Sequence, residues 1–439
     1  MSGAGQGGAP PGAAVESVTE SATESATGIA NQSKPSAALV ARPWPRAPLL
    51  LCAASSRTGP VEGLISLAVW LRAHGHDARL AGDTVRPGED LPGHLARAGV
   101  PIVTALRLSK KLRPGDVLDV LHDARLLTAW VREGAPDLLH CSFAHDMSLV
   151  LWAARRAGRA REELRVVREA HRREDVTPGR FALRRRLLQA MDGVVVRCER
   201  YHDALLAQGL DPRRVAAIPG GVDATTFTPG RTEAARRLRQ KWGVPDDVPL
   251  VGMVARMKPE RLHANLLHAF ARAADEVPGA HLILIGRGED EPALRALSNR
   301  LAPERILFAG YARGAELNEA YRALDVAVWL REGNDGACRG VLEAMATGLP
   351  VIVGDDGASP ELIAGSAADP CAEPCGRVVD PARPDELAAA LVALLGDQGL
   401  RAHLSSLARE RALRFTPERA AASTLEFWRS LRALPPVGR

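Results

Sequence analysis

Residues 328–355 read V-W-L-R-E-G-N-D-G-A-C-R-G-V-L-E-A-M-A-T-G-L-P-V-I-V-G-D. This stretch begins as an apolar strand, breaks at residues 333–336 and resumes as a short helix. We expect the helix to end at Gly348, because glycine is favoured just after a helix and Pro350 cannot continue one. A second apolar run follows at 351–353. A strand, a helix and a strand in this order predict two parallel strands joined by a crossover helix.

Two carboxylates bracket the start of this predicted helix, because Asp335 precedes it and Glu343 lies within it. The backbone N–H groups of Gly336, Ala337 and Cys338 would be unpaired there, and the helix dipole attracts an anion or sugar hydroxyl groups. The simpler interpretation is that Asp335 caps the helix and that Glu343 is solvated, which is the common outcome at a loop-helix junction.

Composition limits the classes of protein. The chain has 439 residues, enough for about two domains, with 46% hydrophobic and 25% charged residues, as in soluble globular proteins. Its net charge is only +5 and aromatic residues are 4%, so a nucleic-acid partner is not expected. The apolar runs fall short of the roughly 18 to 20 residues that span a bilayer.

The cysteines and the amino terminus indicate the cellular compartment. Six scattered cysteines predict buried free thiols in a reducing, cytoplasmic environment. A zinc site is not expected, because Cys371 and Cys375 lack a second pair of ligands nearby. Residues 1–46 are rich in Gly, Ala, Ser, Thr and Pro and lack the pattern of a signal peptide, so we expect a disordered tail.

Apolar strand-like runs alternate with helical stretches along the rest of the chain. This rhythm predicts an α/β protein of two Rossmann-like, doubly wound domains that face each other across a cleft. We place an amino-terminal, acceptor-side domain at 47–220, a donor-binding domain at 221–412, and a last helix within 413–439 that crosses back to the first domain. Strands are predicted at 47–54, 77–81, 100–106, 137–142, 164–170, 193–198, 215–218, 250–255, 281–285, 306–309, 326–330, 351–353 and 376–379.

Ligands bind such sheets beyond the carboxyl ends of the strands. Arg256 and Arg261 follow the strand at 250–255, where guanidinium groups could hold a diphosphate, although a basic loop is more often simply solvated. The turn Gly286-Arg-Gly288 lacks the third glycine of a dinucleotide-binding loop, which makes NAD binding a weak hypothesis. His171 ends the strand at 164–170, but a lone histidine is more often structural. Neither Asp-x-Asp nor a His/Glu cluster with ligand spacing occurs, so metal-assisted chemistry is not favoured.

An ordered set of segments resembles the donor domain of the family 4 retaining glycosyltransferases, which have the GT-B fold. The resemblance extends over most of residues 218–379, and the first half of the chain resembles the family more loosely. The segments are Ile218-Pro-Gly-Gly-Val-Asp223, Ala255-Arg-Met-Lys-Pro-Glu-Arg261, Leu266-Leu-His-Ala-Phe270, Leu284-Ile-Gly-Arg-Gly288, Phe308-Ala-Gly-Tyr311, Leu324-Asp-Val-Ala-Val328 and residues 335–350.

The resemblance implies roles for individual residues. Arg256 and Arg261 would bind the donor diphosphate, Glu343 the nucleotide ribose and Asp335 the transferred sugar. Further donor contacts are implied for the amides of Gly336 and Ala337, for Gly59, Gly286, Gly310 and Tyr311, and for His171 as a histidine near the donor sugar.

Three residues depart from the family pattern. Asp335 stands in place of a glutamate that is one methylene longer, Arg261 in place of a lysine, and Leu262 in place of a glycine.

The resemblance implies a retaining, metal-independent glycosyltransferase of the hexosyltransferase type that acts in cell-envelope polysaccharide biosynthesis. Its donor would be a nucleotide-diphosphate sugar, its acceptor a glycan, a lipid-linked glycan or a small molecule, and we expect no tightly bound cofactor. The alternatives are a nucleotide-sugar epimerase or a sugar phosphorylase on the same fold, and a non-catalytic subunit that binds a nucleotide sugar.

The basic stretch at 155–186 has two interpretations. Its alternating cationic and apolar groups could lie against an anionic membrane, which would make the protein peripheral on the inner membrane face. Otherwise it is a solvated amphipathic helix whose leucines enter the core.

Overall fold

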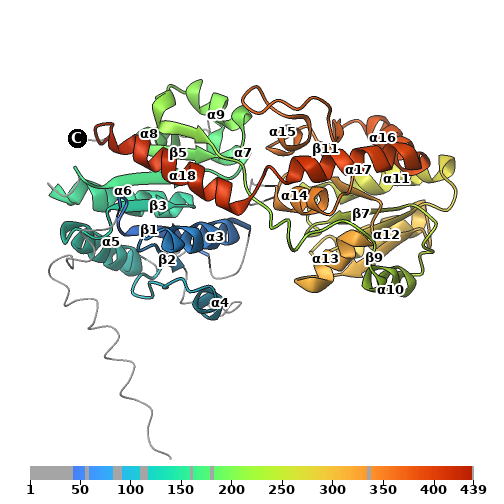
Figure 1. Cartoon of the computed structure of the whole chain (residues 1–439), viewed down its shortest axis with the longest axis horizontal. Helices are drawn as coiled ribbons and strands as arrows, with labels where there is room; N and C mark the ends of the chain where they lie inside the picture. Colours follow the sequence, from blue (N-terminus) through green and yellow to red (C-terminus); the bar gives the residue numbers. More distant parts are fainter. Residues whose placement is uncertain are drawn as a thin grey trace, which may run out of the picture.

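Two sheets, each of six parallel strands, lie side by side in the computed structural model (Figure 1). The structure describes residues 43–54, 59–82, 91–108, 117–158, 162–177, 182–333 and 338–437. The strands are nearly continuous apolar runs, because helices cover both faces of a parallel sheet and bury alternate side chains equally. The predicted fold of two doubly wound α/β halves is confirmed.

The first sheet has the strand order β2-β1-β3-β4-β5-β6. Its strands are β1 (Pro48–Cys52), β2 (Arg79–Gly82), β3 (Leu138–Cys141), β4 (Arg165–Glu169), β5 (Gly193–Val196) and β6 (Val215–Ala217). The surrounding helices are α3 (Gly59–Ala73), α4 (Leu91–Arg97), α5 (Val117–Arg132), α6 (Ala144–Arg156), α7 (Arg173–Val176), α8 (Ala182–Gln189) and α9 (Glu199–Leu206), with a 3-10 turn, η3, at Pro212–Arg214.

The predicted strand at 100–106 is wrong. Only Ile102 pairs there, through an isolated parallel bridge with Leu80. The run is apolar because Val100, Val103 and Leu106 are buried, so side-chain burial alone explains the pattern that suggested a strand.

The second sheet has the strand order β12-β11-β10-β7-β8-β9. Its strands are β7 (Leu250–Val254), β8 (His281–Ile285), β9 (Ile306–Gly310), β10 (Val326–Trp329), β11 (Val351–Gly354) and β12 (Gly376–Val379). Its helices are α10 (Glu233–Trp242), α11 (His263–Glu276), α12 (Glu291–Leu301), α13 (Ala315–Arg322), α14 (Arg339–Ala346), α15 (Ser359–Ala364), α16 (Pro384–Gly396) and α17 (Gln398–Ala412), with a 3-10 turn, η4, at Pro259–Arg261.

Helix α14 is the helix expected within residues 328–355. It ends at Ala346, and Gly348 follows with φ 73°, the left-handed conformation that favours glycine after a helix. At its other end Cys338 also has a positive φ of 49°. The helix therefore starts directly after a residue in the left-handed conformation.

The last helix, α18 (Pro417–Arg432), leaves the second sheet and packs against α3, β4 and β5 of the first (Figure 1). Its start is capped by the Thr416 hydroxyl, which accepts a hydrogen bond from the N–H of Arg419 at 3.2 Å. At its end the buried Arg165 guanidinium donates to the carbonyls of Leu431 and Arg432, each at 3.0 Å. The carboxyl end of the chain thus ties the two halves together.

Candidate functional site

A cavity of ≈ 720 Å³ lies between the two halves. The carboxyl ends of parallel strands border it from both sides, as expected for sheets of this type. The first half contributes Gly59, Glu62, His140, Glu169 and Arg197 to its wall; the second half contributes Tyr311, Arg339 and Glu343.

Glu343 is a buried carboxylate in the wall of this cavity, with only 4% of its surface exposed. Its Oε2 accepts a hydrogen bond from the hydroxyl of Tyr321 at 3.0 Å, and its Oε1 accepts one from Nε of Arg339 at 2.7 Å. Burying a carboxylate is costly unless it is paired in this way. The two donors therefore hold the carboxylate in one orientation, which suits the recognition of ligand hydroxyl groups.

A second, smaller pocket of ≈ 140 Å³ surrounds the amino end of α14. Among the described residues, four guanidinium side chains line it, from Arg256, Arg261, Arg331 and Arg339, together with one carboxylate, that of Glu332. Arg339 lines both cavities, so the two are neighbours. An excess of fixed positive charge beside a helix amino terminus suits a phosphate group.

Backbone contacts of two glycines fix the loop that carries Arg256. A Cβ atom added to Gly286 would stand 2.0 Å from the carbonyl oxygen of Ala255, and one added to Gly288 would stand 2.0 Å from that of Met257. Both glycines are thus required because the turn packs closely against this loop. The close packing accounts for the Gly-x-Gly pattern without a dinucleotide-binding site.

Glu332 is a pocket residue that the sequence interpretation passed over. Its Oε1 accepts hydrogen bonds from the Tyr201 hydroxyl and from the N–H of Arg173 at 3.2 Å, both in the first half. Arg261 donates to its backbone carbonyl. Glu332 therefore contacts the first half and lines the arginine pocket at the same time.

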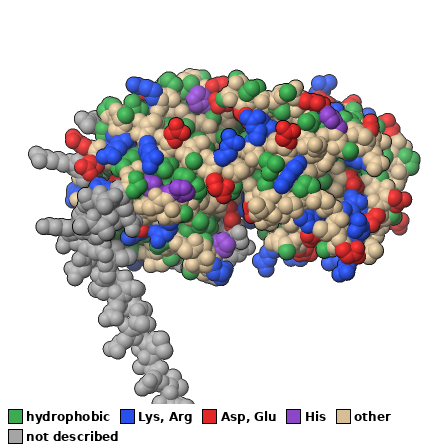
Figure 2. Space-filling view, viewed as in Figure 1, with side chains coloured by type: hydrophobic (Ala, Val, Ile, Leu, Met, Phe, Trp, Pro, Cys, Tyr) green, Lys and Arg blue, Asp and Glu red, His purple; other side chains and the backbone are tan. Residues whose placement is uncertain are grey.

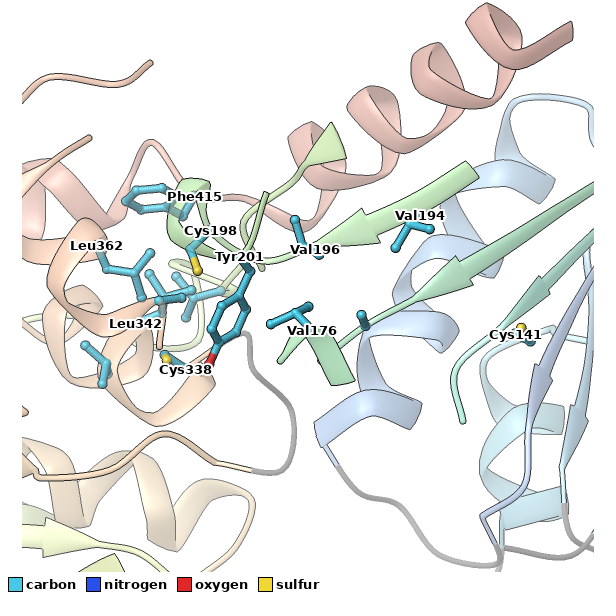
Figure 3. Close-up of a cluster of buried hydrophobic side chains, with 14 of the residues drawn as sticks. Cys141, Val176, Val194, Val196, Cys198, Tyr201, Cys338, Leu342, Leu362 and Phe415 are labelled. Atoms are coloured by element: carbon cyan, nitrogen blue, oxygen red, sulfur yellow. The ribbon is translucent and has the colours of Figure 1, made fainter. Parts of the chain in front are cut away.

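An apolar contact surrounds the same junction. Tyr201 projects from α9 toward Cys338 and Leu342 of the α14 region, with Leu362 and Phe415 close by (Figure 3). A second polar link lies at the start of α9, where Glu361 accepts the N–H groups of Glu199 at 2.8 Å and Arg200 at 2.9 Å. The structure therefore shows the two halves in contact beside the site.

Three polar side chains lie at the carboxyl ends of neighbouring strands on the first-half wall. Nε2 of His140 lies 3.1 Å from Oε2 of Glu169, and Arg197 forms an ion pair with Oε1 of the same carboxylate. Burial, and secondarily the charges of Arg197 and Arg168, lower the pKa of His140 to about 3, so this imidazole is neutral. The sequence interpretation also missed this cluster, although charged residues in a buried strand were a signal that it exists.

The structure brings several predicted residues to the two cavities. Gly59 begins α3 and lines the larger one, as does Tyr311, whose side chain is 55% exposed and follows Gly310 at the end of β9. His171 is buried beside Glu169, with Nε2 3.9 Å from Oε2, and does not belong to the residues described as lining either cavity. Its predicted role stays a prediction.

The predictions for Asp335, Gly336 and Ala337 lie outside the described residues. Their neighbours Gly333 and Cys338 both line the arginine pocket.

One group with metal-ligand spacing occurs in the described part of the chain. It consists of Glu199, His202 and Asp203 on one turn of α9, and none of the three lines the cavities described above. The six cysteines are free thiols.

The outer surface mixes charges of both signs. On the face shown in Figure 2, basic and acidic side chains alternate over both halves. Among the described helices, none combines the length and the apolar composition that crossing a membrane would require.

Two sequence models of known families match the chain. The model described as Glycosyltransferase Family 4 matches residues 58–226, and the model described as Glycosyl transferases group 1 matches residues 235–411. The first match covers most of the half around the first sheet, and the second covers the arginine pocket and Glu343.

Individual relatives share part of the chain. A GDP-mannose-dependent alpha-mannosyltransferase of Mycobacterium tuberculosis is 36% identical over 161 residues, which are 37% of this chain and 38% of that protein. A D-inositol 3-phosphate glycosyltransferase of Corynebacterium efficiens is 30% identical over 264 residues, or 58% of this chain and 60% of that protein. The chain thus spans about half the length of the curated relatives it matches.

A solved structure supports the fold over nearly the whole described chain. The crystal structure of Anabaena Alr3699/HepE in complex with UDP and glucose has a TM-score of 0.69 and 20% identity. The similarity covers 88% of this chain and 100% of that one. At this identity the likeness concerns the fold alone.

Proposed function

We propose that this chain, which belongs to the family 4 glycosyltransferases, transfers a sugar from a nucleotide-diphosphate sugar to an acceptor bound between its two sheets. The observation that carries the proposal is the buried carboxylate of Glu343, oriented by Tyr321 and Arg339 next to the arginine pocket. To bind a nucleoside diphosphate, a protein needs a group that hydrogen-bonds to the ribose hydroxyls beside groups that bind the phosphates.

The donor would lie across the two cavities. The diphosphate would bind Arg256 and Arg261, while Glu343 would accept hydrogen bonds from the ribose hydroxyls. Asp335 is proposed to contact the transferred sugar, and Gly336 and Ala337 to offer backbone amides. Glu332, which lines the same pocket, is a second carboxylate within this region.

Negative charge develops on the departing diphosphate as the glycosidic bond breaks. Guanidinium groups around the pocket would stabilise this charge, and they would do so more strongly than in water. We propose that the reaction retains the anomeric configuration and needs no metal ion, as the family resemblance implies. The contacts of Glu332 and Glu361 with the first half would keep the site closed and limit hydrolysis of the donor.

The donor class follows from the chemistry and from the relatives. A relative is named for GDP-mannose, and the structurally similar HepE binds UDP and glucose. We propose a nucleoside-diphosphate hexose as donor, with no other tightly bound cofactor, and a glycan or lipid-linked glycan as acceptor in cell-envelope biosynthesis.

The placement of the protein in the cell is also a proposal. The exposed Arg185 and Arg186 on α8 suit a peripheral contact with an anionic membrane from the cytoplasmic side. Binding to vesicles containing phosphatidylglycerol, compared with neutral vesicles, tests this contact; equal binding to both would contradict it.

A thermal-shift screen with nucleotide-diphosphate sugars tests the donor assignment. At 100 times its Kd the matching donor should stabilise the fold by about 2.7 kcal/mol. Incubation with that donor alone then separates the hypotheses, because a new sugar nucleotide formed without an acceptor would indicate an epimerase. No stabilisation by any member of a panel of GDP and UDP sugars would contradict the assignment.

A further inference from the structure

The wall of the large cavity opposite Glu343 carries a group of polar side chains to which no role has been assigned above. His140 is the penultimate residue of β3, Glu169 ends β4 and Arg197 directly follows β5. These strands are neighbours in the sheet, so the three side chains meet at one edge. All three line the cavity, and the donor residues proposed above come from the opposite half.

The cluster is built into the protein interior. The side chains of His140, Glu169 and Arg197 are 1%, 4% and 10% exposed. The Nδ1 atom of His140 is buried without a hydrogen-bond partner in the described part of the chain. Burying such groups at the border of a cavity is costly, and a ligand that hydrogen-bonds to them would offset that cost.

We propose that Glu169 and Arg197 form the acceptor subsite, and that the acceptor presents a neutral, polyhydroxylated ring, such as a glycoside, to this pair. The inference rests on the proposed function, because it assigns the acceptor side of the same cavity. A carboxylate accepts hydrogen bonds and a guanidinium donates them, while neighbouring sugar hydroxyls do both.

The charge balance of this wall favours a neutral group over a phosphate. Its charged side chains in the described chain are the carboxylates of Glu62 and Glu169 and the guanidinium of Arg197. The positive charge of Arg197 is already compensated by Glu169. His140 adds no charge, because burial holds its pKa at about 3. Glu62 in turn lies 3.9 Å from Nη1 of Arg339 on the opposite wall. A phosphate would therefore find no uncompensated positive charge on this wall.

The shape of the wall leaves room for a ring. Gly63 of α3 and Ala420 and Ala421 of α18 line it with little or no side chain. A Cβ atom added to Gly63 would meet only Nη2 of Arg197, at 3.8 Å. A larger side chain at position 63 therefore has space in the cavity itself and does not disturb the packed core.

Two variants test the assignment. Glu169→Gln removes the charge and keeps the shape, and Gly63→Leu fills the space beside Arg197 without touching the donor residues. Glu163→Gln is the matched control, because the Glu163 side chain is 79% exposed and outside the cavity. Each protein is tested by ligand-observed saturation-transfer NMR with methyl α-D-mannopyranoside and with mannose 6-phosphate, in the presence of GDP and of UDP. Calorimetric titration of the two nucleotides is run in parallel.

The wild type and Glu163→Gln should bind the neutral glycoside more tightly than mannose 6-phosphate. Each cavity variant should bind the glycoside at least about tenfold more weakly, while nucleotide affinity stays unchanged. Because Glu169→Gln could disturb the buried ion pair, Gly63→Leu keeps the test valid if the first variant does not fold.

Equal glycoside binding by Gly63→Leu and the wild type would overturn the subsite. So would nucleotide binding with no glycoside binding in the wild type, or a preference for mannose 6-phosphate; in these cases the donor assignment survives. Failure of the wild type to bind either nucleotide would instead count against the proposed function.

Discussion

Removing the hydroxyl of Tyr321 measures how much its hydrogen bond to Glu343 contributes, while the rest of the site stays unchanged. The Tyr321 ring is fully buried and packs edge-on against Phe227, with ring centroids 5.9 Å apart. Tyr321→Phe keeps this packing and opens no cavity. It removes the 3.0 Å hydrogen bond to the Glu343 carboxylate. A hydrogen bond to a charged group contributes about 1.5–3 kcal/mol, so the free energy of unfolding should fall by about 2 kcal/mol.

The same change should weaken nucleotide binding, because the carboxylate loses a hydrogen-bond donor that orients it. If half of the loss of about 2 kcal/mol appears in binding, the Kd for the nucleoside diphosphate should rise about fivefold. Urea unfolding and calorimetric titration measure the two effects separately. Tyr311→Phe is the control for stability, because its exposed hydroxyl should change the free energy of unfolding by less than about 0.5 kcal/mol. An unfolding free energy and a Kd both equal to wild type would refute the role given to Tyr321.

Three further changes test other parts of the structure. Gly286→Ala places a Cβ atom 2.0 Å from the Ala255 carbonyl oxygen, so we expect a loss of about 3 kcal/mol in stability and weaker nucleotide binding; a stable variant with normal binding would contradict this packing. Glu361→Ala removes the acceptor for two N–H groups at the start of α9 and should cost about 1–2 kcal/mol in chemical denaturation, whereas no change would show that the contact is idle. Burial raises the pKa of Asp146 from 3.8 to about 6, so between these values the folded chain holds a proton that the unfolded chain has lost. The free energy of unfolding therefore falls as pH rises through this window, and Asp146→Asn should remove that slope in pH-dependent denaturation.

The sequence predicted the sheets well, because buried parallel strands are continuous apolar runs. It failed at residues 100–106, where burial of Val100, Val103 and Leu106 occurs without strand pairing. Periodicity reports which side chains are buried, and hydrogen bonding between strands is a separate property that depends on the neighbouring segment. The end of α14 before Gly348 was predictable because glycine conformation is a local property.

The candidate site was only partly predictable, because it is assembled from segments far apart in the sequence. Arg256, Arg261 and Glu343, which line the two cavities, could be proposed from the sequence because each lies beside a recognisable turn or in a recognisable helix. Glu169 and Arg197 were missed, since their meeting depends on the order of β4 and β5 in the sheet. The strand Arg165–Glu169 nevertheless contains three charged residues in a fully buried segment, which is a usable sign of a functional or structural cluster.

The pocket lined by Arg256 and Arg261 is the central claim, and Arg256→Ala tests it most directly. Arg256 is exposed, lines that pocket and has no hydrogen bond or ion pair with the other described residues, so its removal should leave the fold intact. The measurement is the release of nucleoside diphosphate from the donor selected by thermal shift, with thermal unfolding as the control. We predict a wild-type melting temperature and a loss of turnover of at least about 100-fold, as expected when a charge that stabilises the leaving group is removed. Full turnover in Arg256→Ala would contradict the account.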